Sequence, residues 1–234
     1  MTIGRSASGR GTFVTFEGPE GSGKTTQAAW LAARASRAGL SVVSTREPGG
    51  TAVGERIRSL LLDSGVAVAI GPWTDAFLFN AARAQLVAEV VEPALARGDL
   101  VVCARFADST LAYQGAGGGL PVADLRTLGA LATRGLRPDL TIVLDVAPEV
   151  GLARKSGDER TRFEDGFDVA FHRRVRSGFL ALAAAEPDRF AVVDATGGRE
   201  VVSEAVLATL DRLPGLASRL RVSDPTREQE RIHT

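Results

Sequence analysis

The residues best suited to chemistry form one glycine-rich run near the start of the chain, Gly18-Pro19-Glu20-Gly21-Ser22-Gly23-Lys24-Thr25. Its spacing fits the pattern G-x-x-x-x-G-K-[ST], whose backbone N–H groups form a nest for phosphate at the start of a helix. Lys24 would then reach the β- and γ-phosphates of a nucleotide, and the Thr25 hydroxyl would bind Mg²⁺. The run therefore predicts a site for a nucleoside triphosphate and magnesium.

The segments on either side of this run are those that a phosphate loop requires. Residues 12–16 are rich in types that favour strands, and residues 25–38 have a helical pattern that Gly39 ends. A flexible Gly/Ser linker is the alternative interpretation, but it does not explain a Lys-Thr pair at the start of a helix. Strand, loop and helix in this order favour the phosphate loop.

Three further groups of side chains could bind a second, anionic ligand. Arg58 and Arg105 could hold its phosphate, because a guanidinium group matches phosphate geometry. Phe79 and Arg83 are four residues apart on a predicted helix and so share a face, where a ring and a guanidinium could recognise a base. Tyr113-Gln114 would lie near the same crevice. From the residues alone, Arg58 could equally be a solvated helix charge and Phe79 a core aromatic.

Composition argues against several classes of protein. The chain has 234 residues, 44% of them hydrophobic, with 28 Lys and Arg against 28 Asp and Glu. The balance of charge argues against broad binding of nucleic acid. The sequence contains no apolar run of about 18 residues, so no membrane span is expected. The single cysteine, Cys103, is expected to be buried in a strand. The first eleven residues lack the apolar core of a secretory signal, so we expect a cytoplasmic protein.

Strand and helix patterns alternate along the chain. Further strands are expected at 40–44, 99–103, 140–146 and 190–194. Helices are expected at 52–62, 73–97 with a bend near Pro93, 110–114 before a run of glycines, 122–133, a short one from 148, 167–185 and 200–213. This alternation predicts an α/β fold, a single domain with a doubly wound, five-stranded parallel sheet. The expected boundaries are a flexible leader over 1–11, the domain over 12–213 and a tail over 214–234.

Five motifs resemble the thymidylate kinase family. They are TREPGGT at 45–51, FNAARAQ at 79–85, ARFADSTLAYQG at 104–115, RPDLTIVLDVAPEVGL at 137–152 and RFE at 162–164. The likeness runs from about Phe13 to Leu210, and the first and third motifs are highly specific for the family. It implies the architecture of P-loop nucleoside monophosphate kinases, often dimeric. It also implies transfer of the γ-phosphoryl group of ATP to dTMP with Mg²⁺, giving ADP and dTDP for dTTP biosynthesis.

The resemblance assigns roles to residues by position. ATP would be bound by Gly18, Pro19, Glu20, Gly21, Ser22, Gly23, Lys24, Thr25 and Thr26, and Thr25 would also hold magnesium. dTMP would be bound by Glu47, Pro48, Arg58, Phe79, Arg83, Arg105, Ser109, Tyr113 and Gln114. Phe79 would stack on thymine, Arg83 with Ser109 or Gln114 would read its edge, and Tyr113 would disfavour a 2′-hydroxyl. The implied catalytic residues are Lys24, Arg105, Arg160 and Glu20.

The resemblance also implies a short lid at about 154–163. Glu20 in the phosphate loop resembles the bacterial subtype, in which the catalytic arginine comes from the lid. The local basic residues are Arg154, Lys155, Arg160 and Arg162. An ordinary solvated loop is the alternative interpretation of this run. The choice among the arginines stays open, and Arg160 is preferred.

The chain departs from the family pattern at Ala104, where the family has Asp before the arginine. That aspartate would hold magnesium waters, so its absence removes a carboxylate from the end of a strand. Glu17, Asp108 or Glu164 could take over through water, or the protein could bind nucleotides and turn over slowly. Asp145 also ends an apolar strand, but its place in the LDV-x-PE pattern favours a structural role. A smaller departure is Thr161, where the family often has Asp.

Other functions on the same fold are alternatives. A kinase for another nucleoside monophosphate is disfavoured by TREPGGT and Tyr113-Gln114. A nucleotide-dependent switch is disfavoured because no Asn-Lys-x-Asp pattern is present. A catalytically silent binding protein stays open because of Ala104. A homodimer is expected, with the apolar helix over 73–97 as one source of an interface.

Overall fold

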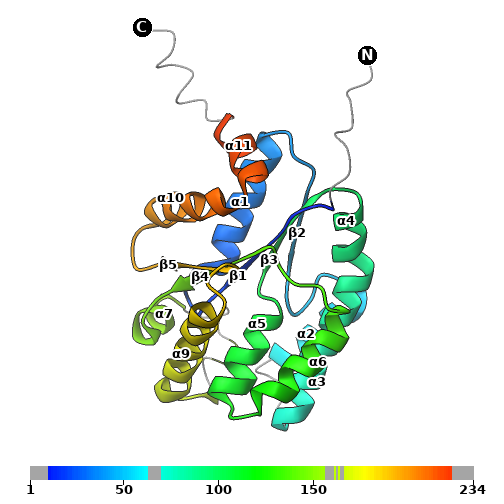
Figure 1. The fold of residues 1–234 in the computed structure, drawn as a ribbon. Helices are drawn as coiled ribbons and strands as arrows, with labels where there is room; N and C mark the ends of the chain where they lie inside the picture. The colour runs from blue at the N-terminus through cyan, green and yellow to red at the C-terminus, as the bar shows by residue number, and fades with distance from the viewer. Residues whose placement is uncertain (1–9, 63–69, 156–160, 162, 164–165, 223–234) are drawn as a thin grey trace, which may run out of the picture.

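The computed structural model describes residues 10–62, 70–155, 161, 163 and 166–222. Within these ranges the chain forms a five-stranded sheet in which every neighbouring pair of strands is parallel. The strand order is β2-β3-β1-β4-β5, so the chain leaves β1 toward one edge and later returns to its other side. Helices cover both faces (Figure 1), which confirms the predicted doubly wound α/β fold.

The strands are β1 (Phe13–Glu17), β2 (Val42–Arg46), β3 (Leu100–Ala104), β4 (Leu140–Asp145) and β5 (Phe190–Asp194). The larger helices are α1 (Lys24–Arg37), α2 (Ala52–Leu62), α3 (Pro72–Leu86), α6 (Val122–Thr133), α9 (Val169–Ala185), α10 (Arg199–Thr209) and α11 (Pro214–Val222). The shorter ones are η1 (Val87–Val91), α4 (Glu92–Ala96), α5 (Ala107–Thr110), η2 (Leu111–Gly117), α7 (Pro148–Arg154) and η4 (Leu210–Arg212). The predicted elements at 52–62, 122–133 and 190–194 have the observed bounds, and the others differ by a few residues at their ends.

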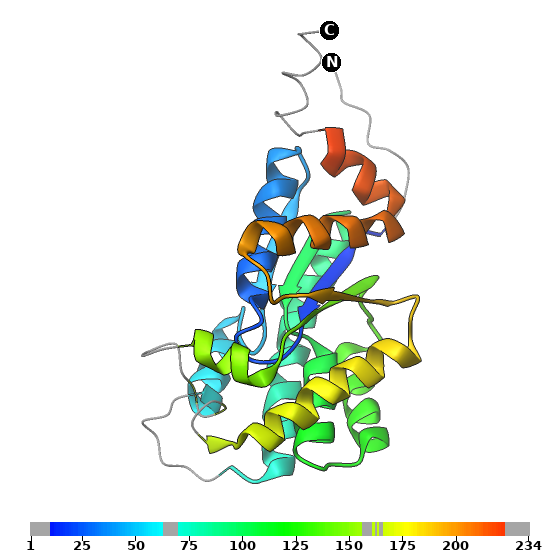
Figure 2. The same cartoon turned by 90° about the vertical axis from the view of Figure 1, so that its left-hand side faces the viewer.

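Each face of the sheet is covered by its own set of helices. On one face α1, α10 and α11 pack over β1, β3, β4 and β5, with Phe16 and Ile142 fully buried between the layers. The other face is covered by α3, η1, α4, α5, η2, α6 and α9, and Figure 2 shows the two layers on opposite sides of the strands. Because both faces are covered, β1, β3 and nearly all of β4 are buried, and Cys103 is buried in β3 as expected.

The long segment predicted over 73–97 contains a π-helical turn, and the bend expected near Pro93 stays a prediction. The N–H of Glu92 bonds to the carbonyl of Val87, five residues back, so η1 contains one more residue in its turn than an α-helix. Pro93 follows in the first turn of α4, where its missing N–H is tolerated. The π-helical turn η1 therefore separates α3 from α4, and Pro93 lies directly after it.

A second π-helical stretch, η2, continues through two of the glycines that were expected to end it. These small residues allow η2 and α9 to pack closely. A Cβ at Gly117 would be 2.7 Å from the ring of Phe171, and one at Gly178 would be 2.6 Å from the Cβ of Ala116. The glycines here serve close packing between helices, so the stretch ends only at Gly118.

Residues 214–222, which belong to the predicted tail, form α11. Leu216 and Leu220 are buried in the core layer beside α1. The division into leader, domain and tail stays a proposal, and this packing favours a domain limit after α11 rather than at 213.

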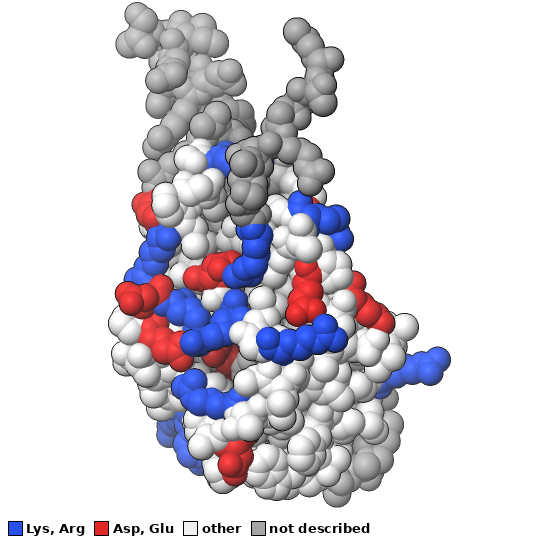
Figure 3. Space-filling view, turned by 45° about the vertical axis from the view of Figure 1, so that its right-hand side comes forward, with Lys and Arg blue, Asp and Glu red and all other residues white. Residues whose placement is uncertain are grey.

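Among the described residues, no helix is long and apolar enough to cross a membrane. On the face drawn in Figure 3, basic and acidic side chains are interspersed, so this face is not a uniformly basic surface.

Candidate active site

The phosphate loop connects β1 to α1 in a conformation that requires glycine. Gly18 and Gly21 have φ of 136° and 67°. A Cβ at Gly21 would be 1.9 Å from the carbonyl oxygen of Gly151, so α7 leaves no room for a side chain there. α1 begins at Lys24, directly after Gly23. The loop thus ends at the positive end of a 14-residue helix, as an anion site requires.

Lys24 is held inside this loop. Its Nζ donates to the carbonyl oxygens of Gly18 (3.0 Å) and Pro19 (2.6 Å) and to Ser22 Oγ (3.3 Å). Burial, and after it the nearby positive charge of Arg105, lowers the pKa of Lys24 to about 7. A lysine in this state gains its charge most readily when an anion arrives beside it.

Glu20 and Arg105 connect the phosphate loop to the end of β3. The Arg105 guanidinium donates to Glu20 Oε1 and to the Tyr113 hydroxyl (3.2 Å), and it lies 4.9 Å from the centre of the Tyr113 ring. The Tyr113 hydroxyl donates to Glu20 Oε1 at 2.8 Å. Burial raises the pKa of Tyr113 well above its usual value, so it stays a neutral donor. The three side chains form one hydrogen-bonded group at the centre of the site.

Glu20 is ionised within this group. Burial by itself would raise the pKa of Glu20, but Arg105, Lys24 and Lys155 together outweigh burial and lower this pKa well below its usual range. Lys155 Nζ lies 3.2 Å from Glu20 Oε2. The carboxylate of Glu20 thus faces the cations of Arg105 and Lys155 and also Lys24, which gains its charge when an anion binds, so the site suits phosphate groups.

These side chains line a cavity of 580 Å³. It brings most of the predicted site residues together. Those that line it are Glu20, Gly21, Gly23, Lys24, Thr25, Thr26, Glu47, Pro48, Arg58, Phe79, Arg105, Ser109, Tyr113 and Gln114. The cavity therefore joins the phosphate loop to the residues predicted for the second ligand.

The second-ligand side of the cavity combines a cation with an aromatic ring. Arg58 NH1 donates to the carbonyl of Pro48 at 2.9 Å, and burial followed by the charge of Arg46 lowers the pKa of Arg58. Phe79 is half-buried, with its ring 6.1 Å from that of Phe163. On this side of the cavity, the Arg58 guanidinium can therefore bind an anion, and the Phe79 ring can stack on a flat ring.

Arg83 is placed differently from the other residues predicted to bind the second ligand, because it is fully buried and is not among the residues that line the cavity. Its guanidinium donates to Glu47 Oε2 (2.9 Å), Asn80 Oδ1 (2.8 Å), the Phe106 carbonyl (3.1 Å) and Thr110 Oγ1 (3.1 Å). Burial raises the pKa of Glu47 to about 7. In this arrangement Arg83 holds together the elements behind the base pocket, and direct contact with a base stays a prediction.

The carboxylates that could replace the missing aspartate are bonded to other groups. Ala104 lines the cavity at the end of β3 and offers no metal ligand. Glu17 accepts hydrogen bonds from Phe106 and Ser109, and Asp108 pairs with Arg189 at 2.7 Å. Glu164 lies outside the described residues. Thr25 lines the cavity beside Lys24, a position that suits a ligand of magnesium bound to nucleotide phosphates.

Asp145, expected to be structural, forms a two-bond ion pair with Arg176, each bond 2.7 Å long. Gly18, Pro19 and Ser22 contact Lys24 without lining the cavity. Arg160 and Arg162 lie outside the described residues, so the choice of lid arginine stays a prediction.

The lining residues that sequence analysis did not assign are Arg46, Leu62, Thr110 and Phe163. Arg46, Thr110 and Phe163 belong to the TREPGGT, DSTLAYQG and RFE motifs. Their positions in those motifs were a usable signal, whereas Leu62 carried none.

A phosphate loop on a doubly wound sheet, facing a second cationic and aromatic pocket across one cavity, defines the P-loop nucleoside monophosphate kinases. The family model described as thymidylate kinase matches residues 16–206, and the chain belongs to the thymidylate kinase family.

Individual proteins show the same relationship. The chain is 55% identical to the thymidylate kinase of Thermomicrobium roseum over 199 residues, which cover 85% of this chain and 93% of that protein. It is 51% identical to the thymidylate kinase of Deinococcus radiodurans over 201 residues, covering 86% and 97%. The crystal structure of thymidylate kinase from Ehrlichia chaffeensis superposes with a TM-score of 0.71 at 32% identity, covering 86% of this chain and all of that one.

Proposed function

We propose that this chain transfers the γ-phosphoryl group of ATP to dTMP, giving ADP and dTDP. The observation that carries the proposal is the single cavity that joins the phosphate loop to Arg58, Phe79 and Arg105, in a chain of the thymidylate kinase family. Phosphoryl transfer depends on positioning and on charge neutralisation, and this cavity offers groups for both.

On the donor side, the phosphate loop and Lys24 would bind the β- and γ-phosphates. Lys24 would exchange its bonds to the loop carbonyls for bonds to phosphate oxygens. Magnesium, when bound, would neutralise phosphate charge, with Thr25 as its protein ligand. Thr26 and the other loop residues would complete the ATP site. Arg160 stays our proposed lid arginine.

On the acceptor side, Arg58 and Arg105 would bind the phosphate of dTMP, which keeps two mutually repelling anions in line. Phe79 would stack on thymine, while Ser109 and Gln114 would lie near its edge. Glu47 and Pro48 would close the wall behind the phosphate. The Tyr113 ring would leave little room for a 2′-hydroxyl, which favours deoxynucleotides. A phosphate oxygen of dTMP then attacks the γ-phosphorus, and the bond to the bridging oxygen of ADP breaks.

We propose that Ala104 lowers the rate of phosphoryl transfer but does not change which reaction the protein catalyses. A missing electrostatic group at a phosphoryl-transfer site lowers the rate by about 10²–10³. Relatives that are named kinases do not favour a silent binding protein. We therefore propose an active kinase whose turnover rises when the carboxylate is restored.

The test is steady-state ADP release with ATP, Mg²⁺ and each of dTMP, dUMP, UMP, CMP and AMP, for this chain and Ala104→Asp. Selective turnover of dTMP supports the proposal, with faster turnover in Ala104→Asp. Turnover of another monophosphate in preference to dTMP, or no dTMP response in either protein, contradicts it.

We also propose that the protein is cytoplasmic, because its proposed nucleotide substrates are intracellular metabolites. We further propose that it forms a homodimer. Exposed apolar side chains on α2, α3 and α6 support an interface, and they include Leu60, Trp73, Phe77, Val122 and Leu131. The lower part of the face in Figure 3 carries few charged side chains. Light scattering after size exclusion tests the dimer, and a mass of one chain would contradict it.

A further inference from the structure

Glu17 is a carboxylate that the proposed reaction does not use. It is the last residue of β1, it is fully buried, and it does not line the cavity. Its Oε1 accepts from the backbone N–H of Phe106 (2.7 Å) and of Ser109 (3.1 Å), and its Oε2 accepts from Ser109 Oγ (2.6 Å). Both oxygens are thus bonded to protein donors from one short segment.

That segment is the turn that carries Arg105. Arg105 has a φ of 71°, a left-handed conformation that is costly for a residue with a side chain. α5 starts two residues later, and Phe106, at its N-cap, supplies no side-chain hydrogen bond. The free N–H groups at a helix start need hydrogen-bond acceptors, and side-chain oxygens can provide them. Glu17 supplies that acceptor from the neighbouring strand.

The same turn determines where the Arg105 guanidinium lies. The N–H of Arg105 bonds to the carbonyl of Phe16 (2.9 Å), directly before Glu17. Arg105 NH1 lies 3.4 Å from Ser109 Oγ, the hydroxyl that Glu17 holds. Glu17 therefore contacts the turn both before and after the point where α5 begins.

The far side of α5 is anchored separately. Asp108 forms a two-bond ion pair with Arg189 (2.7 and 2.9 Å), just before β5, and Thr141 Oγ1 lies 3.3 Å from Asp108 Oδ2. Asp108 is 4% exposed. The Asp108–Arg189 pair thus holds one side of α5 in place. The hydrogen bonds to Glu17 hold the other side, which is the turn that carries Arg105.

We propose that Glu17 is a positioning residue, which holds the left-handed turn at Arg105 by capping α5 and so keeps the Arg105 guanidinium aimed at the acceptor phosphate. This inference rests on the proposed function for the identity of the acceptor, but the capping of the turn does not depend on it. It assigns Glu17 a role other than that of a substitute magnesium ligand.

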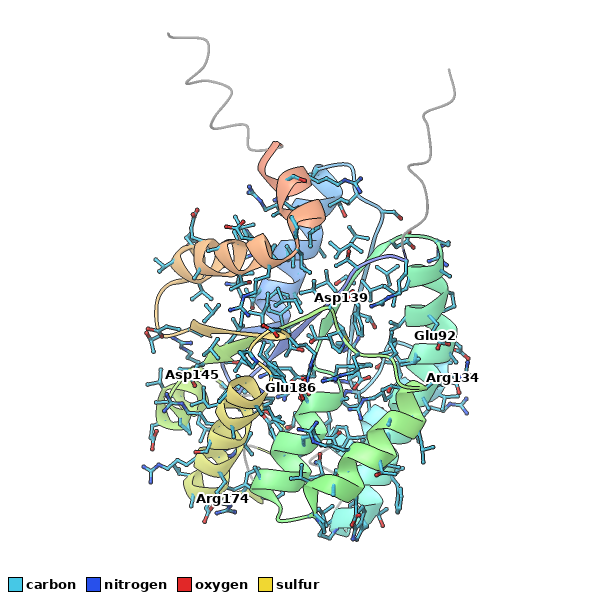
Figure 4. The ribbon with its side chains drawn as sticks, in the orientation of Figure 1. Glu92, Arg134, Asp139, Asp145, Arg174 and Glu186 are labelled. Atoms are coloured by element: carbon cyan, nitrogen blue, oxygen red, sulfur yellow. The ribbon has the colours of Figure 1, made fainter. Side chains whose placement is uncertain are left out.

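The test compares Glu17→Ala with Glu17→Gln. Glutamine can still accept from both N–H groups and can donate to Ser109 Oγ, whereas alanine removes all three bonds. The matched control is Asp139→Ala, because Asp139 Oδ2 likewise accepts from a backbone N–H, that of Phe13, at 2.7 Å. Asp139 immediately precedes β4, at the end of the sheet away from the phosphate loop, and is labelled in Figure 4.

The first readout is hydrogen exchange at the Phe106 and Ser109 amides, which needs no substrate. We expect faster exchange at these amides in Glu17→Ala alone, with β1 and β3 amides still protected. The second is the dissociation constant for dTMP, with a loss of about 10²-fold in Glu17→Ala, near-normal binding in Glu17→Gln and Asp139→Ala, and unchanged ATP binding. In an Arg105→Ala background, Glu17→Ala should weaken dTMP binding little further, because both changes remove the same interaction with dTMP.

Unchanged exchange at Phe106 and Ser109 in Glu17→Ala overturns the proposal. So does a dTMP defect that adds fully to that of Arg105→Ala, or one that raised Mg²⁺ restores. If Glu17→Ala does not fold, Glu17→Asp replaces it, because its shorter side chain keeps the carboxyl group but cannot keep all three bonds. If wild type binds no dTMP, the proposed function fails while the exchange result still decides the role of Glu17.

Discussion

Glu20 and Arg105, which are 85 residues apart in the sequence, form an ion pair in the middle of the candidate active site. The pair joins the phosphate loop to the end of β3, so it lies between the predicted donor and acceptor phosphates. Tyr113 bonds to both partners. This group connects the two halves of the cavity, and several predictions depend on it.

Arg105→Ala should reduce kcat/KM for dTMP by about 10²–10³, because it removes the cation that we propose to neutralise the acceptor phosphate. Steady-state kinetics with varied dTMP measure the effect. Arg176→Ala is the matched control, since Arg176 also forms an ion pair, with Asp145, but does not line the cavity. Equal losses in the two variants would show that the effect of Arg105 is not specific to the site.

Phe79→Ala should raise KM for dTMP by about 10- to 100-fold, corresponding to the roughly 1–3 kcal/mol that a base gains by stacking on an aromatic ring. Phe77→Ala should leave this KM nearly unchanged, because Phe77 is on the same helix but is 55% exposed and does not line the cavity. Titration of dTMP against both variants separates stacking from a general effect on α3. A normal KM in Phe79→Ala would exclude Phe79 from base binding.

Binding of MgATP at pH 8 should take up about one proton. The pKa of Lys24 is about 7 in the free site, so at pH 8 Lys24 is mostly neutral, and phosphate groups raise its pKa on binding. Calorimetry in buffers of different ionisation enthalpy measures the uptake. The same titration at pH 6, where Lys24 is already charged, should show much less. No net uptake at pH 8 would mean that Lys24 is charged before ATP arrives.

Glu17→Gln should change how stability depends on pH. Burial raises the pKa of Glu17 from 4.5 to about 7, so between these values the folded protein keeps a proton that the unfolded chain releases. The free energy of unfolding therefore falls as pH rises through this window, by about 3 kcal/mol from this group. Glutamine does not titrate, so Glu17→Gln lacks this fall in the free energy of unfolding. Glu47 also has a pKa of about 7, and its contribution to the pH dependence stays the same in both proteins.

Urea unfolding at pH 5 and pH 8 measures this difference. From pH 5 to pH 8, the free energy of unfolding of Glu17→Gln should rise relative to that of wild type. A constant difference in the free energy of unfolding at both values would contradict the raised pKa of Glu17.

Local signals in the sequence predicted the phosphate loop, because its chemistry depends on consecutive residues from Gly18 to Thr25. The sheet and most helices followed from alternation and apolar period. The π-helical turns η1 and η2 did not, because one extra residue in a turn leaves the apolar pattern almost unchanged. The close packing of η2 depends on contacts with α9, which lies about 60 residues further along the chain.

Long-range partners were the main limit on predicting the site. The sequence places Glu17 where it could hold magnesium through water, but its hydrogen-bond donors are 89 and 92 residues away and become visible only in the fold. Arg83 was expected to face a base, yet four protein acceptors surround it. Side-chain type and spacing cannot reveal that such a group is already bonded to the protein.

The most direct test of the central claim is product analysis of one reaction, ATP and dTMP with Mg²⁺, by chromatography over time. The proposed function predicts that dTDP and ADP appear in equal amounts, that ADP formation needs dTMP, and that Lys24→Met forms neither. ADP without dTDP would make the protein an ATPase rather than a thymidylate kinase. Failure to form either product, in both this chain and Ala104→Asp, would contradict the account.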